Sequence, residues 1–501
     1  MSSNSQLSSL NSDIDEKKSL GQFFTSDRIT EYIVKQVGLN ENTTIADLSC
    51  GDGAFLTTCY DYLEKKGIST SQILSNIYGV EISEKQLKIA KQNLAKNFKS
   101  NYKILDKNLI QADTIESTSQ KLLENFPTIQ KENGFDIIVG NPPYLPTTLS
   151  PENKKDPIFS KLVYGQVNTT TLMIGRAYSL LKDGGKLGLL LPKSILRVNS
   201  YKKLRRFLVS KFSIEEIIDV GAEFADVRGE QFILLAKKDS KKQNNIKIGY
   251  FWKNKPLTTH KISFKKITKF DNFLLLENDN LYKLVDKITS DHQNLEQCSN
   301  GQIYRGINIG GNSKFVSYKP VKSYFRGLRG DSIKQFAYDY FIFIKNQDYP
   351  KLDVVKQKKI VLQNIFSSES GIIANYDDKG LVTLDTVTNI VIENEDPYYV
   401  LGILNSSLIR FFMVFAIYNQ SRLTMHTDRT YIGTIPIPKI SKSLKKSIIT
   451  EVKNEMKDQS KSKLNDLIFE AFDLTDFEKK EIINQLKKFE EMGKVNGKKD
   501  E

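Results

Sequence analysis

Three acidic residues in the first quarter of the chain follow apolar segments, at spacings that suit the binding of a nucleoside. Asp47 precedes a loop that contains Gly51 and Gly53, and glycines let a backbone turn tightly and approach a ligand closely. Glu81 lies 28 residues past Gly53, where a carboxylate can accept two hydrogen bonds from ribose hydroxyls. Asp113 ends the next apolar segment, and its carboxylate can accept a hydrogen bond from an adenine amino group.

The form of the glycine loop separates two classes of cofactor. Loops that bind dinucleotides usually read GxGxxG, whereas this loop reads DLSCGDG, and its spacing fits S-adenosyl-L-methionine (SAM) better. A plain turn between a strand and a helix is the alternative interpretation. The residues that we expect to bind the cofactor from this half of the chain are Asp47, Ser49, Gly51, Gly53, Glu81, Ile82, Asp113 and Asn141.

The tetrapeptide Asn141-Pro142-Pro143-Tyr144 directly follows another apolar segment, at 135–140. With the glycine loop, Glu81 and Asp113 ahead of it in this order, the chain resembles the γ-class, TaqI-like adenine-N6 DNA methyltransferases of type II restriction–modification systems. A chance proline-rich turn would not fall at this place in such an order. The resemblance covers most of the chain.

The resemblance implies a catalytic role for each position of the tetrapeptide. The adenine amino group would donate hydrogen bonds to the Asn141 side-chain oxygen and the Pro142 carbonyl, which localises the nitrogen lone pair for attack on a methyl group. The prolines restrict the backbone so that this carbonyl points at the substrate. Tyr144 would stack on the base, which must be flipped out of the duplex to be reached. Positioning then replaces a general base with a tuned pKa.

Two further segments match the family pattern. In the segment 21–25, the resemblance implies that Thr25 holds the methionine carboxylate, although Ser26 stands where the family usually has proline. In the segment 223–230, Phe224 matches the aromatic residue that packs on the other face of the flipped base. An ordinary core phenylalanine is the alternative interpretation of Phe224.

The region 300–435 resembles the target-recognition region of the same group. It holds six of the chain's 12 arginines, whose planar side chains can read guanine or clamp a phosphate. For any single arginine a structural ion pair is at least as good an explanation. The candidates that we name for DNA contact are Arg305, Arg326, Arg329 and Lys334.

Placing these residues together requires strands that end at one edge of a sheet. Near-continuous apolar segments alternate with helical patterns up to residue 238, which is typical of a doubly wound, mainly parallel α/β sheet, the class I SAM-dependent methyltransferase fold. The polar run 237–245 then breaks the pattern. We therefore expect a catalytic domain at 1–240, a mixed α+β target-recognition domain at 241–435 and a helical tail at 436–501, with a capping box at 475–478.

The net charge of +14 is unevenly distributed. Residues 1–240 carry +3, residues 241–440 carry +10 and residues 441–501 carry +1. A localised basic excess suggests a polyanion, here double-stranded DNA, although a lysine-rich composition can also reflect codon usage in the source organism. Hydrophobic residues at 39% exclude a largely disordered chain, and three cysteines and three histidines make neither a disulfide framework nor a zinc site, so we expect no metal.

The chain shows no signal for export or membrane insertion. The N-terminus lacks an apolar run after a basic start, and the most apolar stretch, 400–418, contains Arg410 and is expected to be a buried helix. We expect a cytoplasmic, nucleoid-associated prokaryotic monomer, with any cognate restriction endonuclease a separate protein.

The sequence alone also allows other functions. The NPPY chemistry also methylates glutamine in proteins and guanine in RNA, but a basic segment of 200 residues after the catalytic domain has no use there. A modification subunit of a multisubunit system would have its DNA read by another chain. A combined nuclease would need a PD…ExK pattern, which we do not find, and a catalytically dead binding protein would not keep every catalytic position.

Overall fold

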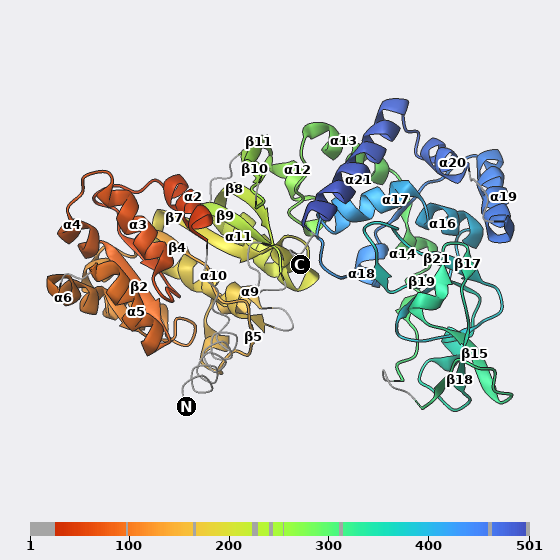
Figure 1. The fold of residues 1–501 in the computed structure, drawn as a ribbon, viewed down its shortest axis with the longest axis horizontal. Helices are drawn as coiled ribbons and strands as arrows, with labels where there is room; N and C mark the ends of the chain where they lie inside the picture. The colour runs from red at the N-terminus through yellow and green to blue at the C-terminus, as the bar shows by residue number, and fades with distance from the viewer. Residues whose placement is uncertain are drawn as a thin grey trace, which may run out of the picture. The chain divides into compact units, whose positions relative to one another are not determined.

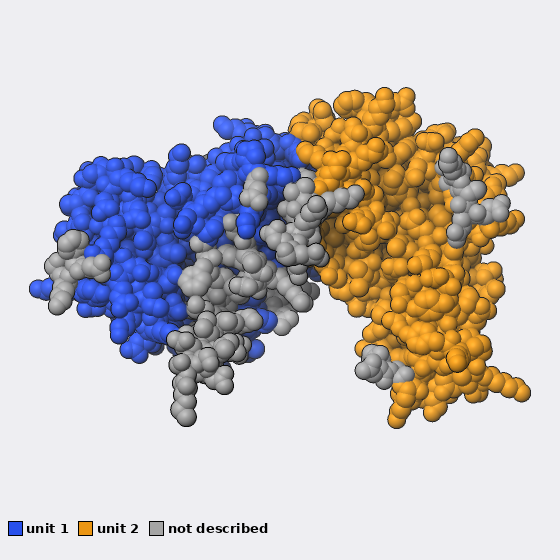
Figure 2. Space-filling model, viewed as in Figure 1, with its two compact units in different colours: residues 1–277 blue, residues 278–501 orange. Residues whose placement is uncertain are grey.

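The computed structural model divides the chain into two compact units, residues 1–277 and 278–501 (Figure 2). Each unit is described by itself. The residues that the structure describes are 26–96, 99–163, 167–222, 229–239, 244–253, 255–309, 314–458 and 463–496.

The first unit is built on a nine-stranded sheet (Figure 1). Its strand order is β11-β10-β8-β9-β7-β4-β1-β2-β3, and all neighbours are parallel except those that involve β9 or β11. The predicted α/β class with a mainly parallel sheet is confirmed. The strands are β1 (Ile45–Asp47), β2 (Ile77–Glu81), β3 (Leu109–Gln111), β4 (Phe135–Gly140), β7 (Leu181–Pro192), β8 (Phe212–Gly221), β9 (Gln231–Lys238), β10 (Asn245–Tyr250) and β11 (Thr258–Ser263).

Helices and one short two-stranded sheet complete this unit. This sheet pairs β5 (Pro146–Thr147) antiparallel with β6 (Val167–Asn168). The helices are α2 (Asp27–Val37), α3 (Ala54–Glu64), α4 (Thr70–Ser75), α5 (Glu84–Ala95), α6 (Lys99–Asn108), α7 (Ser119–Glu124), α8 (Pro127–Lys131), α9 (Phe159–Leu162), α10 (Thr169–Leu180), α11 (Lys202–Lys211) and α12 (Phe264–Ile267).

Helix α2 shows why these elements pack. Its buried residues Ile29, Ile33 and Val37 recur every four positions, so they form one apolar face. Gly38 ends the helix in the left-handed region at φ +78°. The face lies so close to Gly188 in β7 that a Cβ there would stand 2.7 Å from the Ile33 side chain, so only glycine fits.

The first unit extends further along the chain than the sequence pattern predicts. The expected boundary at residue 240 differs from the structure, because β10 adds to the sheet beside β8 and β11 follows it. The polar run 237–245 leads from one strand of this sheet to another. Residues 241–277 carry nine Lys/Arg and two Asp/Glu, so +7 of the +10 that we attributed to the target-recognition domain belongs to the first unit.

The second unit contains two four-stranded sheets, β13-β23-β19-β21 and β14-β18-β15-β22. Residues 436–501 belong to this unit and form no separate domain. Its strands are β12 (Gln293–Asn294), β13 (Ile303–Arg305), β14 (Val316–Ser317), β15 (Tyr324–Leu328), β16 (Ile333–Lys334), β17 (Ala337–Tyr338), β18 (Ile342–Lys345), β19 (Lys359–Gln363), β20 (Ile365–Phe366), β21 (Ala374–Asp377), β22 (Val382–Thr383), β23 (Val387–Ile390), β24 (Met425–His426) and β25 (Pro436–Ile437). Its helices are α13 (Asp279–Thr289), α14 (Leu295–Cys298), α15 (Leu352–Val355), α16 (Pro397–Leu404), α17 (Ser407–Phe411), the π-helix η6 (Phe412–Ile417), α18 (Arg429–Ile432), α19 (Lys442–Asp458), α20 (Leu464–Ala471) and α21 (Asp476–Asn496).

The apolar stretch 400–418 is buried as predicted but is not one helix. It breaks after α16, because the Asn405 side chain bonds the backbone of Ala374 and Ser406 caps α17. Among the described residues no single helix is long and apolar enough to cross a membrane; α16 and the α17–η6 segment meet that test only together, across a 55° bend. Arg410 is held by the Ser368 carbonyl and Glu490.

The last helix begins with the predicted capping box. The Glu478 amide donates to the Thr475 hydroxyl at 3.3 Å, and the Thr475 amide donates to the Glu478 carboxylate at 2.8 Å. Lys287 of α13 pairs with the same carboxylate at 2.9 Å and so links the two helices. The capping-box prediction is confirmed.

Candidate functional site

Asp47 ends β1 and is buried, with 2% of its surface exposed. Its Oδ1 accepts a hydrogen bond from the Ser49 amide at 3.0 Å. A Cβ at Gly140, the last residue of β4, would stand 2.8 Å from the same oxygen, so β4 can end beside Asp47 only with glycine. Burial raises the pKa of Asp47 to about 7; the Ser49 amide opposes this shift, and the nearby charges of Glu81 and Asp52 contribute to it.

Glu81 ends β2 and ties two loops together. One carboxylate oxygen accepts from the Gly51 amide at 2.8 Å, and the other accepts from the Ser83 amide at 2.9 Å. Gly53 begins α3 at φ +87°, where a Cβ would lie 3.1 Å from Ala90 of α5. Ile82, next to Glu81, is half-exposed. The structure thus brings the predicted residues of the first two loops together.

Asp113 lies two residues past β3 and is half-buried. Its Oδ1 accepts from the amides of Ile115 and Glu116, at 2.8 and 3.0 Å, so it caps the turn that follows. The neighbouring Thr114 hydroxyl donates to the Leu48 carbonyl at 2.6 Å, which joins this turn to the first loop. The three predicted carboxylates therefore lie on three connected loops at the C-terminal edge of the sheet.

Arg176 supports the Asp113 turn from helix α10, and no motif predicts it. Its guanidinium is buried and donates to the carbonyls of Thr114 and Ile115, at 3.2 and 3.1 Å, and to Asp156 at 3.1 Å. The only signal in the sequence is a single charge inside an otherwise uncharged helical segment. Such a charge is expected to be paired when it is buried.

The tetrapeptide leaves the sheet at the end of β4, beside the Asp47 loop. The Tyr144 hydroxyl donates to the Asn141 side-chain oxygen at 2.5 Å, and the Leu190 carbonyl of β7 lies 3.2 Å away as a second, weaker acceptor for the same proton. Burial raises the pKa of Tyr144, so the hydroxyl stays a donor. The tyrosine thus fixes which end of the Asn141 amide presents oxygen, a role that differs from base stacking, which stays a prediction.

Two threonines at the start of α10 hold the tetrapeptide from the other side. The hydroxyls of Thr169 and Thr170 both donate to the Pro143 carbonyl, at 2.6 and 2.8 Å. The Thr169 hydroxyl also accepts from the Leu145 amide at 3.0 Å, and the Thr169 amide donates to the Leu145 carbonyl at 2.9 Å. The only sequence signal is the run Asn168-Thr-Thr-Thr, in which Asn168 caps the helix.

We expect the paired substitution Thr169→Val and Thr170→Val to lower kcat about 10- to 100-fold, because the Pro143 carbonyl loses both donors and the adjacent acceptors move. Cofactor affinity should stay unchanged, since the hydrogen bonds that the two threonine hydroxyls make among the described residues go to Pro143 and Leu145 and not to the Asp47 or Glu81 loop. Steady-state kinetics and cofactor titration measure the two effects separately. Serine at both positions should restore kcat; loss of cofactor binding in the valine variant, or no rescue by serine, would contradict a positioning role.

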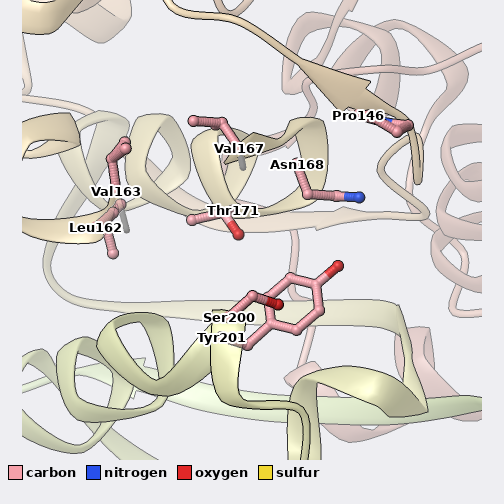
Figure 3. Close-up of a pocket in the computed structure, with 8 residues that line it drawn as sticks. All are labelled: Pro146, Leu162, Val163, Val167, Asn168, Thr171, Ser200 and Tyr201. Atoms are coloured by element: carbon pink, nitrogen blue, oxygen red, sulfur yellow. The ribbon is translucent and has the colours of Figure 1, made fainter. Parts of the chain in front are cut away.

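A pocket of about 140 Å³ opens beside the tetrapeptide (Figure 3). Its wall begins at Pro146, two residues after Tyr144. The Thr171 hydroxyl and the Tyr201 ring point into it from α10 and from the segment before α11. Leu162 and Val163 form an apolar side. The surface next to the tetrapeptide is therefore hollowed and partly polar.

Two of the predicted site residues cannot be placed. Thr25, with the segment 21–25, and Phe224 lie outside the described residues. Their roles in cofactor and base binding stay predictions.

The four DNA-contact candidates lie in the second unit, and three of them already hold carboxylates. Arg305 makes two hydrogen bonds to Asp428, at 2.8 and 3.0 Å. Arg329 pairs with Asp331 at 2.8 Å and donates to the Tyr318 hydroxyl, and Lys334 pairs with Asp339 at 3.5 Å. Arg326 is exposed and lies 3.5 Å above the Phe341 ring, with no carboxylate in ion-pair distance among the residues that the structure describes. Their role in DNA contact stays a prediction.

Comparisons with known proteins agree with this division of the chain. Residues 75–225 match the Eco57I restriction-modification methylase family, and residues 324–437 match the TaqI-like C-terminal specificity domain. The chain therefore joins an Eco57I-type restriction-modification methylase domain to a TaqI-like C-terminal specificity domain, and the recognised family resemblance is confirmed.

Its relatives are enzymes of restriction–modification systems. The chain is 28% identical over 320 residues to a putative type II restriction enzyme and methyltransferase of Methanocaldococcus jannaschii, covering 58% of this chain and 26% of that protein. It is 23% identical over 362 residues to the type II methyltransferase M.BsuBI of Bacillus subtilis, covering 70% and 68%. The chain spans 23 to 42% of the length of the first three curated relatives that it matches.

Solved structures share the fold over most of the chain. The type IIL restriction-modification enzyme MmeI, determined in complex with DNA, matches with a TM-score of 0.66 at 14% identity, over 95% of this chain and 79% of that one. A nuclease-deletion mutant of the type ISP enzyme LlaGI, determined with a DNA substrate mimic, matches with a TM-score of 0.57 at 14% identity, over 87% and 47%.

Proposed function

We propose that this protein methylates N6 of a flipped-out adenine in a specific duplex DNA sequence, with SAM as methyl donor. The observation that carries the proposal is the setting of Asn141. Its side-chain oxygen is oriented by Tyr144, its loop is clamped by Thr169 and Thr170, and it stands beside the Asp47 and Glu81 loops.

The residues around the glycine loop fit this cofactor. SAM supplies an activated methyl group on a sulfonium. A carboxylate has about four acceptor positions, so Glu81 can take backbone amides and ribose hydroxyls together. The raised pKa of buried Asp47 indicates a carboxylate whose ionised form a cationic ligand would favour. The half-exposed Ile82 offers an apolar surface to a purine ring.

The chain's own groups would act mainly by position. The amide oxygen of Asn141 has two acceptor sites, so it can accept from Tyr144 and from the adenine amino group together. The Pro142 carbonyl would accept the second amino N–H. When bound, SAM would supply its methyl carbon in line to the nitrogen lone pair while Asn141 and the Pro142 carbonyl hold the amino group, and the proton that the nitrogen then loses would pass to water. No side chain has to remove that proton before the attack.

The specificity domain favours DNA as the substrate. The specificity domain lies in the same chain as the methylase domain. Methylation of protein glutamine or RNA guanine does not need such a domain, and it would be redundant in a modification subunit that relies on another chain to read DNA. In this proposal the second unit reads the target sequence, and the protein acts on chromosomal DNA in the cytoplasm as a monomer. A cognate restriction endonuclease would be a separate chain.

The test is the product itself. DNA from cells that express the chain should carry N6-methyladenine in one short sequence, as read by methylome sequencing and confirmed by mass spectrometry of nucleosides. Methylcytosine would contradict the base assignment, and unmodified DNA together with methylated protein or RNA would contradict the substrate class.

A further inference from the structure

The strongest concentration of unexplained positive charge lies in the methylase unit. Residues 241–277 carry +7 and contain the hairpin of β10 and β11 with its connecting turn. We propose that Lys253 and Lys255, at the tip of this hairpin, bind the phosphate backbone of the DNA away from the target adenine. The proposal rests on the proposed function and adds a second, sequence-independent DNA contact to it.

Sheet topology places the hairpin tip at the catalytic edge. β10 runs parallel to β8, with Tyr250 opposite Asp219, and β8 and β7 run parallel because both are antiparallel to β9. β7 is in turn parallel to β4, which ends at Gly140, directly before Asn141. The end of β10 and Asn141 therefore lie at the same edge. Four strand spacings of about 4.8 Å put them about 19 Å apart.

The tip is fixed at its base by the catalytic core. The Arg28 guanidinium of α2 donates to the Trp252 carbonyl at 3.0 Å and lies 4.1 Å above the Phe251 ring. The Trp252 ring packs on Gly221 of β8, where an added Cβ would stand 3.1 Å from it. The Lys255 amide donates to the Trp252 carbonyl at 3.1 Å and closes the turn. The lysines are thus presented on a supported turn.

The charges of the tip are not balanced within the protein. Lys253 and Lys255 are exposed, and no carboxylate of the described residues forms an ion pair with either. Lys247, lower on the same hairpin, differs because it pairs with Glu216. Lysines on an edge strand can also prevent aggregation, which accounts for Lys261 on β11. Protection of an edge strand does not explain Lys253 and Lys255, because both lie beyond the last paired residues of β10 and β11.

The residue type favours contact with phosphate over contact with a base edge. Lysine is a flexible point charge that gives salt-dependent contacts to the backbone and carries little sequence information. The end of β10 stands about 19 Å from Asn141, which is roughly half a turn of duplex, so the tip a few residues beyond it would meet phosphates within about one helical turn of the flipped base.

The test compares two double variants that remove the same charge, one at the hairpin tip and one at the far end of β11 and on α12. Lys253→Gln with Lys255→Gln removes the tip charges, and Lys261→Gln with Lys265→Gln removes two exposed charges from β11 and from α12, which follows β11 at the opposite edge of the sheet. DNA binding by the full chain is measured from 50 to 200 mM salt on target and non-target duplexes.

We expect the salt dependence to be weaker in the tip variant: the magnitude of the slope of log affinity against log salt should fall by about 1.8, because each of the two lost phosphate contacts contributes about 0.9. The fall should be the same on both duplexes. The control variant should keep the wild-type slope, and Lys253→Arg with Lys255→Arg should restore it. Equal slopes for tip and control variants would overturn the proposal. A wild-type chain that methylates no DNA would instead contradict the proposed function, so the two failures are distinguishable.

Discussion

We expect the replacement of Asn141 with alanine to lower methyl transfer at least about 10²–10³-fold, because in the proposed mechanism the substrate amino group loses the acceptor that localises its lone pair. The loss falls on kcat. SAM affinity should fall much less than kcat, because Asn141 is only one of the residues expected to bind the cofactor, and Asp47 and Glu81 hold their loops through backbone amides that the substitution does not touch. Single-turnover methylation of duplex DNA and cofactor titration by calorimetry measure the two quantities.

Two comparisons make the Asn141 result specific. Tyr144→Phe removes only the hydroxyl that orients the amide, so we expect a smaller fall, of about 5- to 30-fold, at constant cofactor affinity. Asn125→Ala changes the same residue type at an exposed helix end and should leave the rate unaltered. Substantial activity in the Asn141→Ala variant would contradict the catalytic role of the tetrapeptide.

Replacing Asp377 with alanine destabilises the second unit by about 3–5 kcal/mol, because it leaves the buried Lys359 ammonium without its counter-charge. The two side chains are essentially inaccessible and pair at 2.6 Å between neighbouring strands β19 and β21. Asp377 also accepts from the amides of Leu381 and Lys379, at 2.7 and 3.0 Å, so the turn after β21 loses support as well.

The Asp377→Ala variant should also gain stability as the pH rises. Burial lowers the pKa of Lys359 in the folded protein, and Asp377 opposes that shift. Without the carboxylate the folded pKa falls further, while the unfolded pKa stays near 10.4. Between these values the unfolded chain binds the extra proton, so the free energy of unfolding increases with pH.

Urea unfolding followed by far-UV circular dichroism, at neutral pH and near pH 9.5, tests both statements. Tryptophan fluorescence is unsuitable, because the one tryptophan, Trp252, belongs to the first unit. Asp339→Ala breaks an exposed pair with Lys334 and should cost at most about 1 kcal/mol. Lys359→Met combined with Asp377→Leu should recover most of the lost stability. A small effect of Asp377→Ala at neutral pH would show that the pair is not buried in solution.

Much of the site follows from local sequence. A parallel strand ends at a fixed edge, so a carboxylate, a glycine loop or NPPY placed just after an apolar segment must reach that edge whatever else the chain does. Asp47, Glu81, Asp113 and Asn141 are connected there as expected. The sheet class follows from the same alternation of apolar segments and helical patterns.

The supports of the site could not be predicted, because they come from distant parts of the chain. Thr169 reaches Pro143 across 26 positions, and Arg176 reaches Thr114 across 62. No sequence motif predicts either hydrogen bond. A hydroxyl or a guanidinium can donate to many different carbonyls, and the tertiary packing decides which carbonyl lies within reach. The hydrogen bond of Tyr144 could not be predicted either. An aromatic residue in this motif suggests stacking on the base, whereas its position in the fold makes the hydroxyl a donor to Asn141.

The sequence by itself determined which residues meet at the site, because strand, loop and residue type are encoded within a few positions of one another. Only the tertiary structure decided where the chain divides and which unit carries its charge. A polar run has the same sequence pattern whether it links two domains or connects two strands of one sheet. Here β10 pairs with β8, about thirty residues earlier in the sequence. Residues 241–277, with +7 of the +10 that we attributed to the target-recognition domain, therefore belong to the first unit.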